Sequence, residues 1–154
     1  MTPSPRSADA ALDPDVGELA SRLRLSVTRL ARRLRQEAGD GHTPSQLSAL
    51  AVIANRGPMT LGQVAEHERV APPSITKVVT KLEAEGLVTR SPDPTDGRVT
   101  HVSATAAGRA LIEEYRRRRT TWLAARLQAL PPADQARLAD ALTALDALWQ
   151  EERS

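Results

Sequence analysis

Cysteine is absent from the 154 residues of this chain, and aromatic residues make up only 2%, with no Phe, one Tyr and two Trp. The missing thiols exclude disulfides, thiolate metal sites and every form of cysteine catalysis. With so few aromatic side chains, any core must be built from Leu, Ile, Val and Ala, and helices can do that. Hydrophobic residues at 40% and charged residues at 26% are ordinary for one folded domain.

Long apolar runs are also lacking. No run approaches the roughly 20 residues of a membrane span, and the N-terminal stretch has no apolar signal-peptide core. We therefore expect a cytoplasmic protein with no membrane partner. There is no nucleophile–base pairing and no glycine-rich phosphate loop, and His42, His67 and His101 lack the spacing of metal ligands. The sequence predicts no catalytic residue, no metal site, no cofactor and no enzyme activity.

Apolar periodicity and capping residues predict six helices and one β-hairpin. The helices begin after N-cap signals such as Thr43 and Thr60 and end at Gly or Pro. They are expected over 14–38, 44–56, 61–68, 72–85, 106–130 and 133–150. The hairpin is expected from the β-prone runs 87–90 and 99–103, which flank the turn-forming residues 93–97. Two short helices followed by a hairpin are the parts of a winged helix-turn-helix.

The predicted helix over 72–85, which Gly86 ends, has two chemically different faces. Apolar residues at helical spacing point inward. Five hydroxyl or ammonium side chains remain on the other face: Ser74, Thr76, Lys77, Thr80 and Lys81. Phosphate oxygens and guanine edges accept hydrogen bonds and repel acids, so this face suits the major groove of DNA. The chain has a net charge of only +2, yet both of its Lys residues, against 19 Arg, lie on this one face. An ordinary solvated helix face is the alternative, and the clustering disfavours it.

The hairpin turn supplies a second candidate contact. Asp96 and Gly97 form the tight turn, and Arg98 then places a cation at the tip of the ribbon. There the Arg98 side chain can enter the minor groove, where negative potential is concentrated. Asp96 is expected to orient the Arg98 guanidinium and not to contact DNA itself.

The stretch from residue 70 to residue 108 resembles the recognition helix and wing of the MarR family of bacterial transcriptional regulators. The resemblance rests on Ser74-Ile75-Thr76-Lys77, on the run LEAEGLVTR at 82–90, on Asp96-Gly97-Arg98 and on Thr105-Ala106-Ala107-Gly108. The chain departs from the family where Lys77 stands in place of the commoner Arg and Ala104 in place of the usual Leu. The resemblance implies a homodimer with interleaved terminal helices that reads an inverted repeat in double-stranded DNA, most often a repressor released by a small-molecule effector.

The expected fold class is therefore mainly α with a small β-hairpin wing, a winged helix-turn-helix flanked by N- and C-terminal dimerisation helices. The expected divisions are a flexible tail at 1–12, an N-terminal dimerisation helix at 13–41, a DNA-binding lobe at 42–104 and C-terminal dimerisation helices at 105–154. The long apolar stripes of the flanking helices exceed what one small domain can cover, which independently predicts a homodimer. A winged-helix module that binds protein and not DNA is the alternative function. The sequence does not identify the effector-binding residues.

Overall fold

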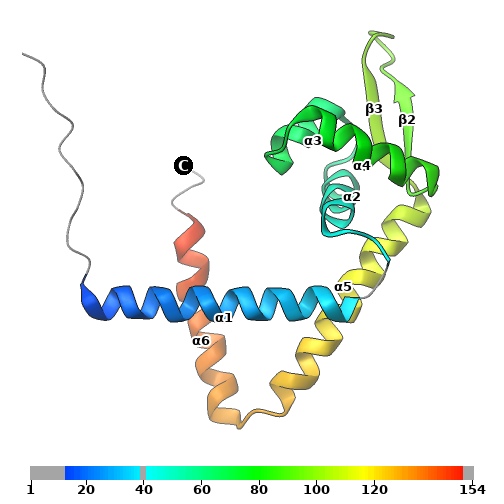
Figure 1. The fold of residues 1–154 in the computed structure, drawn as a ribbon. Helices are drawn as coiled ribbons and strands as arrows, with labels where there is room; N and C mark the ends of the chain where they lie inside the picture. Colours follow the sequence, from blue (N-terminus) through cyan, green and yellow to red (C-terminus); the bar gives the residue numbers. More distant parts are fainter. Residues whose placement is uncertain (1–12, 39–40, 151–154) are drawn as a thin grey trace, which may run out of the picture.

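The computed structural model describes residues 13–38 and 41–150 (Figure 1). The expected tail at 1–12 lies outside the described residues, as do Gly39 and Asp40, which were expected to close the first helix. The elements are α1 (Pro14–Ala38), α2 (Pro44–Arg56), β1 (Met59–Thr60), α3 (Leu61–Glu68), α4 (Pro72–Ala84), β2 (Val88–Pro92), β3 (Thr100–Ala104), α5 (Ala106–Gln128) and α6 (Pro132–Gln150). This order confirms the predicted mainly helical fold with a small hairpin.

The predicted capping residues begin the helices as expected. The Thr43 hydroxyl accepts a hydrogen bond from the Gln46 amide, and the Gln46 side chain accepts one from the Thr43 amide. Thr60 and Gln63 form the same reciprocal box at the start of α3. Each box satisfies two amides that would otherwise lack a helical partner, and an N-cap of this kind stabilises a helix by about 1 kcal/mol.

The sheet has three antiparallel strands in the order β1-β3-β2, because the two-residue strand β1, which was not predicted, pairs with the outer edge of β3. The two hairpin strands begin one residue later than expected, and α4 ends at Ala84, one residue early. The late start of β2 and the early end of α4 have one cause. Gly86 turns the chain at a φ of 71°, and the Leu87 amide donates to the Leu82 carbonyl at 2.9 Å. Leu87 therefore closes the end of α4 and does not start β2.

The hydrophobic core lies in the winged lobe formed by α2, α3, α4 and the sheet. Its fully buried side chains come from all these elements and from the first turns of α5: Leu50, Ile53, Val64, Val79, Leu82, Val102 and Ile112. They are aliphatic, as the scarcity of aromatic residues required. Burying each such side chain contributes about 1.5–3 kcal/mol. The recognition helix and the wing therefore stand on one packed body.

The three long helices extend away from this lobe. Figure 1 shows α1 as a single rod and α5 and α6 as the two arms of a V. Within the chain α1 packs along α5, whereas α6 has only marginal contacts with the other elements. None of the described helices is both long enough and apolar enough to cross a membrane.

Candidate nucleic-acid interface

Packing of α4 against the lobe decides which of its side chains face outward. Ile75, Val79 and Leu82 are buried in the core, at the spacing expected for the inner face of one helix. The predicted polar set is open to solvent: Ser74, Thr76, Lys77, Thr80 and Lys81. The structure therefore brings all five together on one open surface, which we call the α4 face.

The members of the α4 face differ in the hydrogen bonds that they already make. Thr76 donates its hydroxyl to the Pro72 carbonyl one turn earlier, at 3.0 Å. The Thr80 hydroxyl accepts from the Arg90 guanidinium at 3.1 Å. Ser74, Lys77 and Lys81 make no side-chain hydrogen bond or ion pair with any residue that the structure describes. Two full positive charges and one hydroxyl are thus available to an external ligand.

Arg90 is a site residue that the sequence reasoning did not single out. It lies on β2, and its Nε is 3.4 Å from the Glu83 carboxylate while its terminal nitrogen donates to Thr80. These contacts tie the wing to α4 and neutralise the only acidic side chain in the second half of the helix. The quoted run LEAEGLVTR contains both Glu83 and Arg90, but only the fold shows that they meet.

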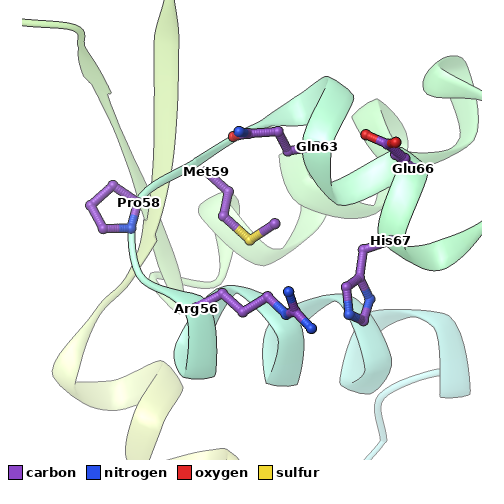
Figure 2. Close-up of a pocket in the computed structure, with 6 residues that line it drawn as sticks. All are labelled: Arg56, Pro58, Met59, Gln63, Glu66 and His67. Carbon is purple, nitrogen blue, oxygen red and sulfur yellow. The ribbon is translucent and has the colours of Figure 1, made fainter. Parts of the chain in front are cut away.

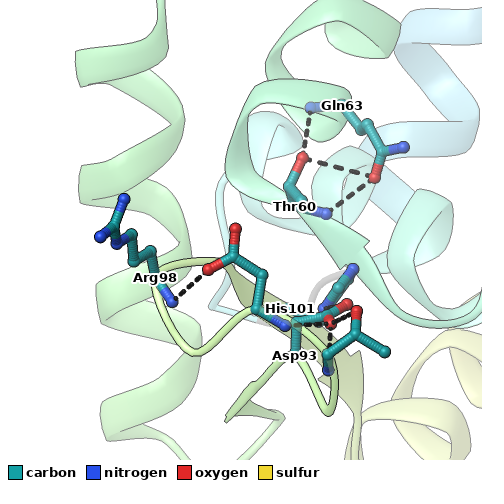
Figure 3. A network of polar contacts seen from close by, with 7 residues as sticks. Thr60, Gln63, Asp93, Arg98 and His101 are labelled. Carbon is teal, nitrogen blue, oxygen red and sulfur yellow. Dashed lines mark hydrogen bonds and ion pairs between the residues drawn. The ribbon is translucent and has the colours of Figure 1, made fainter.

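Asp93 organises the start of the wing turn (Figure 3). Its Oδ1 accepts hydrogen bonds from the Thr95 hydroxyl at 2.6 Å, the Thr95 amide at 2.7 Å and the Asp96 amide at 3.0 Å. These bonds, the Thr95 hydroxyl first, lower the pKa of Asp93 to about 2, with a smaller contribution from nearby His101. Asp93 is therefore ionised at neutral pH, and its bonds hold the turn in one shape.

The expected role of Asp96 is corrected by the structure. Its Oδ1 accepts from the Arg98 backbone amide at 3.1 Å, and the Arg98 guanidinium points away from the turn network (Figure 3). A carboxylate commonly accepts a hydrogen bond from the backbone amide two residues later and so closes a local turn. Asp96 makes this bond and does not pair with the Arg98 guanidinium. Arg98 is exposed at the wing tip. Asp96 positions the backbone that carries Arg98, and the cation itself stays free to reach a partner.

The end of α4 and the start of α5 meet at a very close backbone approach. Thr105 donates its hydroxyl to the Gly86 carbonyl at 2.7 Å and accepts from the Gly108 amide at 3.1 Å. An added Cβ at Gly108 would lie 2.0 Å from the Leu87 carbonyl oxygen. Only glycine permits this approach, so the Thr-x-x-Gly pattern is explained by the junction between α4, the wing and α5.

The histidines do not form a metal centre in the described part of the chain, where no group of three potential ligands occurs. His42 Nε2 lies 2.9 Å from Glu85 Oε2, and His101 Nδ1 lies 3.6 Å from Asp93 Oδ2. Each of these histidines is thus paired with a carboxylate that ends α4 or begins the wing turn.

A polar, cationic helix on a three-helix lobe, followed by a hairpin with an exposed Arg at its tip, defines the winged helix-turn-helix class of transcriptional regulators. The model of the MarR family matches residues 42–100. The chain is 44% identical over 141 residues to an uncharacterized HTH-type transcriptional regulator of Mycobacterium bovis, covering 91% of this chain and 98% of that one. The chain belongs to the MarR family.

Two further comparisons extend this result. A solved structure of a putative transcriptional regulator from Pseudomonas aeruginosa superimposes with a TM-score of 0.80 at 34% identity, over 90% of this chain and 98% of that chain. An HTH-type transcriptional repressor of Bacillus subtilis is 30% identical over 102 residues, which is 63% of this chain and 66% of that one. The family and these relatives are transcriptional regulators and not enzymes.

Proposed function

We propose that this protein is a homodimeric, sequence-specific DNA-binding repressor of a nearby operon. In this proposal the α4 face enters the major groove and Arg98 enters the adjacent minor groove, with Asp96 holding the wing turn. Residues 42–104 act as the DNA-binding lobe, and residues 13–41 and 105–154 as the dimerisation helices. The observation that most supports DNA binding is the α4 face, from which Lys77 and Lys81 project with no internal partner among the described residues.

The α4 face is chemically matched to duplex DNA. Ammonium and hydroxyl groups donate to phosphate oxygens and to the O6 and N7 of guanine. Glu83, the one carboxylate within α4 itself, is paired with Arg90 and so repels an incoming phosphate less. Because Ile75, Val79 and Leu82 anchor the opposite side of α4 in the core, the cations are presented by a rigid helix.

Lys81→Ala should weaken binding to the inverted repeat that the protein selects from genomic DNA by about 1–3 kcal/mol if Lys81 reads a base edge. A shuffled duplex of equal length should then lose much less affinity. Equal losses on both duplexes assign Lys81 to a phosphate. Fluorescence anisotropy at fixed salt measures both affinities. Arg137→Ala on α6, which removes the same charge far along the chain from α4, is the matched control, and unchanged binding by Lys81→Ala on both duplexes would contradict the proposal.

Exposed leucine and valine side chains on the long helices support the dimer. Val16, Leu19, Val27 and Leu30 on α1 and Leu138, Leu142 and Leu148 on α6 are between 41% and 65% exposed within one chain. Ten of the eleven large hydrophobic residues exposed in the described chain lie on α1, on α6 or at the end of α5 and the turn that follows it. A large exposed apolar surface of this kind marks an interface, and burial against a second copy removes it from water.

Leu142→Asp tests the dimer. Leu142 is 59% exposed in the single chain, so the substitution should leave the fold intact. In a two-fold dimer it would bury two carboxylates, and we expect a loss of about 3 kcal/mol or more of association free energy. Sedimentation velocity should show a shift from dimer to monomer. Val70→Asp, at a similarly open position in the lobe (43% exposed), should remain a dimer; a dimeric Leu142→Asp protein would place the interface elsewhere.

Two observations support a repressor that leaves its DNA when a small molecule binds: the name of one relative and a cavity between α1 and α5. The Bacillus subtilis relative is named a transcriptional repressor. A cavity of about 230 Å³ lies between α1 and α5 and is lined by Leu34, Arg116, Arg119, Thr120 and Leu123. Arg116 also donates to the Asn55 side chain on α2 at 2.9 Å, which links the long helices to the lobe. A ligand that prefers one arrangement of α5 and α2 would therefore shift the spacing of the two α4 helices in a dimer.

A further inference from the structure

A separate cavity of about 420 Å³ lies on the winged lobe, between the end of α2, β1 and the outer side of α3 (Figure 2). Its lining residues are Arg56, Pro58, Met59, Gln63, Glu66 and His67. None of them belongs to α4, to the β2–β3 wing or to the cavity between α1 and α5. The cavity is within the size range of small-molecule sites, and nothing in the proposed DNA recognition uses it.

Two nitrogen-bearing side chains converge on this cavity. Arg56 is the last residue of α2, and His67 lies in the last turn of α3. Figure 2 shows the Arg56 guanidinium beside the His67 ring, with the Glu66 carboxylate directed away from both. Among residues 13–38 and 41–150, no carboxylate pairs with Arg56. The His67 Nδ1 lies 3.8 Å from the Glu68 Oε1, so the Nε2 on the other side of the ring is available to a ligand. Arg56 and His67 thus face one cavity, and the one carboxylate that also lines it, Glu66, points away from both.

The rest of the cavity combines one more donor with an apolar wall. The Gln63 Oε1 already accepts from the Thr60 amide, which leaves the Gln63 NH₂ group free to donate. Met59 is only 9% exposed, and Figure 2 shows its side chain extending toward Arg56, with Pro58 at the edge of the cavity. The nitrogen donors of Arg56 and His67 on one side and the apolar Met59 and Pro58 side chains on the other are complementary to a molecule with one anionic and one apolar part.

We propose that this cavity binds a small aliphatic carboxylate, with its carboxylate held by Arg56 and His67 and its hydrocarbon part against Met59 and Pro58. Planar guanidinium groups bind carboxylates through paired, charge-assisted hydrogen bonds. The bound molecule would contact α3, and α3 packs directly on the recognition helix α4.

Titration of the 154-residue chain with hexanoate, followed by NMR of the Met59 methyl group and the His67 side chain, tests the proposal. Both signals should shift in a saturable way, whereas the neutral isostere hexanamide should bind at least about ten-fold more weakly, because it lacks the charge that strengthens the bonds. Arg56→Gln should weaken hexanoate binding by about ten-fold or more, and His67→Gln should also weaken it. Arg109→Gln, which removes an exposed Arg of α5 outside the cavity, should bind hexanoate like the parent protein.

The same titration can overturn the proposal. Shifts confined to Leu34 and Leu123 would place the carboxylate between α1 and α5. Equal affinity in the parent and Arg56→Gln proteins, or equal binding of hexanamide, would show that the cavity does not recognise an anion, and the absence of any shift at Met59 would show that it stays empty. Arg56 is exposed at the end of α2, so its replacement should leave the backbone spectrum of the folded protein unchanged outside the cavity. None of these outcomes depends on DNA binding.

Discussion

The affinity for the selected DNA site should fall about a thousandfold when salt rises from about 50 to 200 mM. Lys77, Lys81 and Arg98 lie on the open surface of the chain, so the proposed dimer would present six such cations to the duplex. Each cation that neutralises a phosphate releases condensed counterions, and the free energy gained from that release shrinks as the salt concentration rises. Anisotropy titrations at several salt concentrations give the slope of log K against log salt, which is expected near about −5 for six neutralised phosphates.

The double variant Lys77→Ala, Lys81→Ala should make that slope shallower by about 0.9 for each phosphate that is no longer neutralised. In a dimer the variant removes four Lys side chains, so about four phosphates at most would lose their contact. A double variant of two Arg residues outside the lobe, Arg126→Ala and Arg137→Ala, removes the same charge and should keep the parent slope. A flat salt profile for the parent protein would instead favour the winged-helix module that binds protein, because such an interface releases few counterions.

Gly108→Ala should destabilise the protein by about 3 kcal/mol, the upper part of the range for overpacking. The new Cβ would lie 2.0 Å from the Leu87 carbonyl oxygen and 3.1 Å from the Leu50 side chain. Because the nearest atom is backbone, a rotamer change cannot relieve the overlap, and α5 must move away from the end of α4. The hydrogen bonds of Thr105 to Gly86 and Gly108 would be strained by the same movement. Urea unfolding followed by circular dichroism measures the loss.

Gly62→Ala is the matched control because Gly62 also lies in the first turn of a helix. Its added Cβ would meet only the Thr60 hydroxyl, at an ordinary 3.8 Å. Alanine favours a helix over glycine, so this variant should be neutral or more stable by up to about 1 kcal/mol. A Gly108→Ala protein as stable as the Gly62→Ala protein would show that α5 does not need its close approach to the end of α4.

Much of the site was readable from short-range patterns. The two capping boxes begin α2 and α3 where Thr43 and Thr60 predicted, since a side chain three residues away decides them. The exposed α4 face follows from the helical spacing of Ile75 and Leu82, which bury the opposite side. Element ends were less accurate, because Gly86 and Leu87 close α4 through hydrogen bonds that the local pattern does not specify.

Contacts between distant segments could not be read in this way. The pairing of β1 with β3 joins Met59 to Val102, and a two-residue strand has no periodicity to reveal it. The cavity between α2 and α3 has the same origin, because Arg56 and His67 meet only once both helices pack on the common core. Their role as a carboxylate site remains a proposal that no spacing in the sequence would have suggested.

The amino-acid sequence alone determined the helix order, the wing and which residues of α4 remain polar, since each of these depends on periodicity and on neighbours a few positions away. Tertiary structure alone decided that Arg90 joins Glu83 and Thr80, that Asp96 holds a backbone amide and not the Arg98 guanidinium, and that Gly108 touches Leu87. Such contacts depend on how whole elements pack in three dimensions, and the packing is set by burial of the shared aliphatic core.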